Sequence, residues 1–87
     1  MGINKLLIEN EERLLLISLI QGVAGKSEWI KNEDGTYFLL MDDDVAELLS
    51  ERVKDKLVLE GFDYFYNLTP EGRIFERLVD KLGEIGW

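Results

Sequence analysis

The chain has 87 residues, among them 18 acidic and 10 basic ones, one proline, and neither histidine nor cysteine. This length fits one domain with a modest core, and a hydrophobic content of 46% is ordinary for a globular protein. The missing residue types exclude histidine acid–base catalysis, serine–histidine triads, disulfides and metal sites built on histidine or cysteine. We therefore predict a single domain over residues 1–87 that is not an enzyme and binds no cofactor or metal.

The net charge of −8 constrains the partners. Such a field repels nucleic acid and anionic membranes, and it favours a protein partner with a basic or mixed surface. The N-terminal apolar run is too short for a signal peptide, and no stretch reaches the roughly 20 apolar residues of a membrane span. We expect a cytoplasmic protein without a membrane partner; nucleic acid is disfavoured by charge, and a homodimer is compatible with the sequence.

The first predicted element is a helix that starts at Asn10, where a capping side chain is followed by two glutamates. Residues 14–20 are apolar nearly all round, which predicts a helix buried at the centre of the molecule. Two alternatives fit the preceding residues: the helix begins near Asn4, or residues 3–8 form a short separate piece. Glycines 22 and 25 end the helix.

A β-hairpin is predicted next, because residues 27–31 and 36–41 flank a loop that contains Asp34-Gly35. The continuous apolar run 37–41 indicates a strand buried on both faces. Gly25-Lys26-Ser27 lacks the other glycine of a phosphate-binding loop, and residues 30–41 lack the end ligands of a calcium loop, so we predict neither site.

A second helix follows three aspartates, with Asp44 and Glu47 as the predicted capping box. Capping by residues 42–44 is favoured over a metal site. The helix runs to Glu60 and stops at Gly61, or it ends near residue 55 and residues 56–59 form a strand.

Residues 62–82 predict a strand that leads directly into a helix. Apolar and polar residues alternate over 62–68, Thr69 and Pro70 suit a helix start, and apolar residues recur helically from Ile74 to Leu82, with Gly83 as the stop. The predicted fold is a small single-domain α+β protein with three helices and a two- to three-stranded antiparallel sheet, in the order α-β-β-α-(β)-β-α.

Three groups of residues are candidate binding residues. An acidic row on the second helix is predicted to bind a basic partner, and two aromatic residues are candidate exposed anchors. Trp87 either packs on the core or stays exposed as an anchor. The last helix carries the only basic row available for a phosphate backbone. The acidic row consists of Asp44, Glu47, Glu51 and Asp55. The aromatic candidates are Phe65 and Trp87, and the basic row consists of Arg73, Arg77 and Lys81.

Residues 57–62 (Leu-Val-Leu-Glu-Gly-Phe) and 66–73 (Tyr-Asn-Leu-Thr-Pro-Glu-Gly-Arg) together resemble the wing of winged-helix regulators of the MarR and PadR kind. In those families a leucine-rich helix end leads into a strand, and a Leu-Thr-Pro-x-Gly-Arg stretch opens the next helix. The resemblance implies a winged-helix-like fold in which residues 45–56 read DNA. This chain departs from the pattern, because a hairpin replaces the second helix and residues 45–56 are acidic.

Because phosphate contacts dominate DNA affinity, these acids point away from DNA. We therefore predict a small acidic, non-enzymatic protein-interaction module with a regulatory role. The alternative is a winged-helix DNA-binding transcriptional regulator that acts as a dimer.

Overall fold

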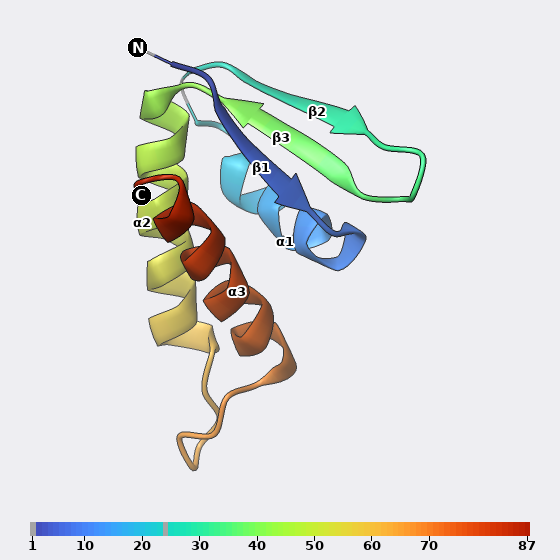
Figure 1. The fold of residues 1–87 in the computed structure, drawn as a ribbon. Coiled ribbons are helices and arrows are strands. Elements are labelled where there is room, and N and C mark those ends of the chain that lie inside the picture. Colours follow the sequence, from blue (N-terminus) through green and yellow to red (C-terminus); the bar gives the residue numbers. More distant parts are fainter. Residues whose placement is uncertain (1, 24) are drawn as a thin grey trace.

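A computed structural model describes residues 2–23 and 25–87, and its elements follow the order β-α-β-β-α-α (Figure 1). These elements confirm the predicted α+β class, with three helices and a three-stranded antiparallel sheet. Their bounds are β1 Asn4–Ile8, α1 Asn10–Ile20, β2 Ser27–Lys31, β3 Tyr37–Met41, α2 Asp43–Glu60 and α3 Pro70–Glu84.

The sheet has the order β1-β3-β2, so the hairpin forms as predicted and β3 is its central strand. Residues 4–8 are the separate piece that the sequence left open, and they pair with β3 along its full length. Leu39 and Met41 of β3 point into the core, whereas Phe38 and Leu40 are half-buried on the other face. The central position explains why β3 is apolar throughout.

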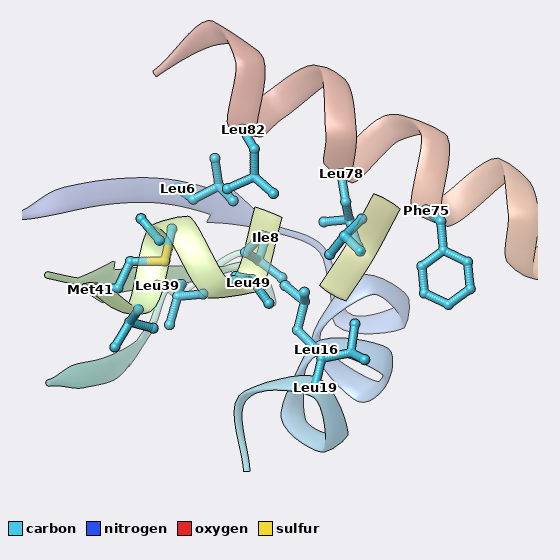
Figure 2. Close-up of a cluster of buried hydrophobic side chains, with 13 residues drawn as sticks. Leu6, Ile8, Leu16, Leu19, Leu39, Met41, Leu49, Phe75, Leu78 and Leu82 are labelled. Atoms are coloured by element: carbon cyan, nitrogen blue, oxygen red, sulfur yellow. The ribbon is translucent and has the colours of Figure 1, made fainter. Parts of the chain in front are cut away.

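One core joins the sheet to all three helices (Figure 2). Leu6 and Ile8 of β1 meet Leu78 and Leu82 of α3, and Leu49 of α2 lies beside them. The α1 helix adds buried leucines from one side only. Its predicted central burial is wrong, because Leu14 remains 63% exposed and Ile17 is also exposed.

The start of α2 differs from the predicted capping box. Asp42, not Asp44, is the N-cap, and its carboxylate accepts a hydrogen bond from the Val45 N–H at 2.9 Å. A second N–H, from Lys26, donates to the same carboxylate at 2.8 Å and ties the preceding loop to the helix. The two donors lower the pKa of Asp42, the Val45 N–H being the larger cause. The helix then continues to Glu60, so residues 56–59 are helical and do not form a strand.

The predicted strand over residues 62–68 is wrong. Only a single bridge joins Phe62 to Leu68, and a turn lies between them. The Asp63 carboxylate accepts hydrogen bonds from the N–H groups of Phe65 at 2.8 Å and Asn67 at 2.9 Å. Because this side chain satisfies the backbone donors locally, it replaces a strand partner.

The α3 helix begins as predicted, with Thr69 accepting a hydrogen bond from the Gly72 N–H at 2.9 Å and Pro70 in the first turn. Its predicted stop at Gly83 is wrong, since the helix includes that residue. Gly86 instead takes the left-handed conformation, with φ of 98°, and the Trp87 N–H donates to the Leu82 carbonyl.

Candidate protein-interaction surface

The loop between α2 and α3 projects from the end of the helix pair that lies away from the sheet (Figure 1). It presents Tyr64, Phe65 and Tyr66, whose side chains are between 77% and 91% exposed. Tyr64 and Phe65 contact each other edge to face, with ring centroids 5.4 Å apart. None of the three belongs to the hydrophobic core or packs against it.

The last turn of α2 extends this aromatic group. Val58 and Leu59 are exposed there, and Phe62 follows at the start of the loop. Exposed large apolar residues that gather in one region of a monomer mark interaction sites. We call this patch the tip surface; it consists of Val58, Leu59, Phe62, Tyr64, Phe65 and Tyr66.

The loop is held rigidly. Asp63 makes the two side-chain contacts given above, and its backbone N–H donates to the Asn67 carbonyl at 2.8 Å. At the base of the loop, the Thr69 N–H donates to the Gly61 carbonyl at 2.8 Å. Tyr66 has a left-handed backbone, with φ of 64°, which costs a residue with a Cβ about 1–2 kcal/mol. A strained residue with an exposed aromatic ring is typical of a binding site rather than of a packing role.

The acidic row predicted on α2 is exposed and leads to the tip surface. We call its members Asp44, Glu47, Glu51 and Asp55 the acidic stripe. Among the residues that the structure describes, none of the four has a basic group within 4.0 Å. Val58 and Leu59 follow Asp55 by three and four residues, so they lie on the same helix face. Acidic and apolar groups therefore form one continuous surface.

The basic row on α3 is largely occupied within the molecule. Arg77 pairs with Glu9 at 3.4 Å and with Glu11, and the Glu11 hydrogen bond is the main cause of its raised pKa. Lys81 pairs with the fully buried Glu12. Arg73 is exposed and forms none of the ion pairs found in the described chain. The row thus holds α3 against α1 and leaves one cation free.

Trp87 packs against the core and is half-buried. Its indole N–H donates to the Asn4 side chain at 3.1 Å, and its carbonyl accepts from the Ser50 hydroxyl at 3.0 Å. Of the two alternatives for this residue, the structure selects packing.

Within residues 2–23 and 25–87, no three or more acidic side chains gather in a way that could hold a metal ion. No helix there is long and apolar enough to cross a membrane. No family model matches the chain, and comparisons with curated proteins and with solved structures found no match either. The surface itself is therefore the basis for a functional proposal.

Of the tip surface, the sequence predicted only Phe65 as an anchor. Tyr64 and Tyr66 belong to the apolar positions of the strand predicted over residues 62–68, and no binding role was predicted for Val58 and Leu59. One local signal favours a turn there: Asp63 precedes these aromatic residues, and an aspartate side chain can accept hydrogen bonds from the backbone N–H groups that follow it.

Proposed function

We propose that this chain is a small, acidic, non-enzymatic interaction module with a regulatory role, which binds a protein partner through the tip surface. The observation that carries the proposal is the rigid exposure of Tyr64, Phe65 and Tyr66 on a loop fixed by Asp63. Tyrosine and phenylalanine are enriched in interfaces, where they bury much area at a small cost in side-chain entropy. A loop already fixed in shape also loses little entropy on binding.

The acidic stripe supports a partner with basic groups beside an apolar segment. Its four carboxylates, which form no ion pair among the described residues, lie on the same helix face as Val58 and Leu59, so a partner seated on the tip surface would extend along them. Complementary charge accelerates association and adds specificity. We therefore propose that the partner presents lysine or arginine next to the apolar residues that cover the tip.

The proposal is tested by selecting binders from a displayed library of random peptides and measuring them by fluorescence anisotropy. The triple variant Tyr64→Ser, Phe65→Ser, Tyr66→Ser should reduce affinity at least about 100-fold, since a few buried aromatic anchors dominate binding energy. The matched control is Leu14→Ser with Ile17→Ser, which removes exposed apolar groups from α1. Equal binding by the triple variant and the wild-type chain would refute the role of the tip.

The role of the stripe has its own control. Glu47→Lys with Glu51→Lys should slow association and reduce the salt dependence of binding. Glu33→Lys with Glu84→Lys changes the net charge equally at exposed positions away from the stripe. If both pairs slow association alike, net charge rather than the stripe attracts the partner.

The alternative function, a dimeric winged-helix DNA-binding regulator, draws support from the resemblance of residues 57–73 and from Arg73, which forms no ion pair within the described residues. Duplex binding should then weaken steeply with salt, and Arg73→Gln should reduce the slope by about one. Lys31→Gln, which also removes one positive charge at an exposed position on β2, serves as the control for a general field effect. Retention on duplex at physiological salt would favour this alternative over the protein partner.

A further inference from the structure

The sheet has a second face, directed away from the helices. Side chains alternate between the two faces along a strand, so the neighbours of the buried Leu6 and Leu39 point outward. Of these outward side chains, Leu7 and Ile30 are exposed, and Phe38 and Leu40 are half-buried without joining the core. We call this surface the outer face; it consists of Lys5, Leu7, Glu28, Ile30, Phe38 and Leu40.

The strand register arranges the outer face in two rows. One row is apolar across all three strands, because Phe38 of β3 lies between Leu7 of β1 and Ile30 of β2. The other row reads Lys5, Leu40, Glu28, with opposite charges on either side of a central leucine.

We propose that the outer face binds a second copy of this chain, with a two-fold axis that runs parallel to β3 between the two sheets. Rotation about this axis places each row of one copy opposite the same row of the second copy. It also places β1 of one copy opposite β2 of the other. Lys5 then faces Glu28 of the second copy, and both central residues meet their own counterparts. The remaining pair, Leu7 against Ile30, is apolar. A two-fold interface requires such self-complementarity.

A two-fold axis that also lies between the two sheets but runs perpendicular to the strands does not bring opposite charges together. It places Lys5 against Lys5 or against Leu7, depending on its position along the strand. The first choice opposes like charges, and the second desolvates a charge without a partner. The charges therefore select the parallel axis, in keeping with the aligned packing of sheets at about 30°.

The size of the patch sets the expected strength. Three strands spaced about 4.8 Å apart and roughly 17 Å long cover about 240 Å² of the sheet plane on each copy, which is below the size of a stable specific interface and fits a weak, transient one. The net charge of −8 on each copy also opposes association. We therefore expect a weak dimer that dissociates on dilution, with a dissociation constant between about 10 µM and 1 mM.

Sedimentation velocity over a wide concentration range tests the interface by charge exchange. Lys5→Glu alone and Glu28→Lys alone each create two like-charge contacts per dimer and should weaken association about tenfold or more. The double variant restores opposite charges and should recover the wild-type dissociation constant to within about threefold. Its recovery also demonstrates that the substitutions do not act by unfolding the chain.

Two controls keep the net charge equal. Lys31→Glu matches Lys5→Glu, and Glu33→Lys matches Glu28→Lys; both positions are exposed and lie off the outer face. Neither control should weaken the dimer as its match does. A wild-type chain that stays monomeric up to about 1 mM, or a double variant that fails to recover, would overturn the proposal. The tip variants should dimerise like the wild type, so this result is independent of the proposed function.

Discussion

Removal of the Lys81 ammonium should destabilise the protein far more than removal of an exposed cation. Glu12 is fully buried, and its Oε1 accepts hydrogen bonds from Lys81 and from the Glu9 N–H, the latter at 2.9 Å. Its Oε2 has no hydrogen bond and lies 3.9 Å from Nε of Arg77. Lys81→Met therefore leaves a buried carboxylate with one remaining hydrogen bond and a distant cation.

The magnitude follows from this burial. Breaking a buried ion pair by deleting one partner costs about 3–5 kcal/mol, and Arg77 keeps the value near the lower end. The whole domain is stabilised by about 4–13 kcal/mol, on the general scale per residue. Glu12→Gln should cost less, about 1–2 kcal/mol, because the Lys81 side chain is 28% exposed and its ammonium can turn to water.

Urea unfolding, followed by tryptophan fluorescence and circular dichroism, measures the difference. With a slope of about 1 kcal/mol per molar urea, Lys81→Met should lower the midpoint by roughly 3 M. Lys56→Met is the matched control. Its partner Glu60 is 3.2 Å away, both side chains are over 40% exposed, and the loss should stay below about 0.5 kcal/mol. Equal losses for the two variants would refute the importance of the buried carboxylate.

Three further predictions concern the backbone and the caps. Tyr66→Gly removes an unfavourable left-handed conformation from a residue with a Cβ, so it should raise the melting temperature by up to about 4–8 °C while weakening partner binding. A lower melting temperature would show that the backbone at Tyr66 is not strained. Gly72→Ala would place a Cβ 2.1 Å from the Gly61 carbonyl oxygen and should lower the free energy of unfolding by about 1–3 kcal/mol. The Cβ of Gly83→Ala would meet no described atom within 4 Å, so this variant should raise the free energy of unfolding by about 0.5–1 kcal/mol. The two urea midpoints should therefore move in opposite directions. The pKa of Asp42 is lowered in the folded state. Its contribution to stability is therefore complete above its unfolded pKa of about 3.9 and is lost as the pH falls through the folded pKa. In that pH range the melting temperature of Asp42→Asn should depend less on pH than that of the wild type.

Strong local signals were sufficient for much of the fold. The Thr69-Pro70 start of α3, the Asp34-Gly35 hairpin loop and the helical spacing of Phe75 and Leu78 each depend on neighbours within a few residues, and the structure confirms all three. The acidic stripe could also be predicted, because its exposure follows from the face of one helix.

The open alternative at residues 4–8 and the wrong strand at residues 62–68 have a common cause, since strand pairing depends on residues far away in the sequence. Residues 4–8 show little alternation, yet they pair with residues of β3 that lie 29 to 37 positions away. Residues 62–68 alternate more clearly, but the Asp63 carboxylate satisfies their backbone donors within the loop. Local pattern alone does not decide between a strand and a stabilised turn. The exposure of Tyr64 and Tyr66 follows from the turn, so the alternation pattern alone did not predict it.

The positions of the two proposed surfaces have a consequence for binding. The tip surface lies at the end of the helix pair, away from the sheet, in a molecule that extends 41 Å along its longest axis (Figure 1). Two copies joined through their outer faces would leave both tips free. A partner with two binding segments could then engage both tips, and the second contact would form at an effective concentration that reaches the millimolar range when the connection spans the distance. A chain whose tips bind weakly would thereby respond to its own concentration, since only the dimer gains this second contact. The same partner should bind the Lys5→Glu variant with the affinity of a single tip. If this variant and the wild type bind the partner equally, dimerisation does not contribute to binding at the tips.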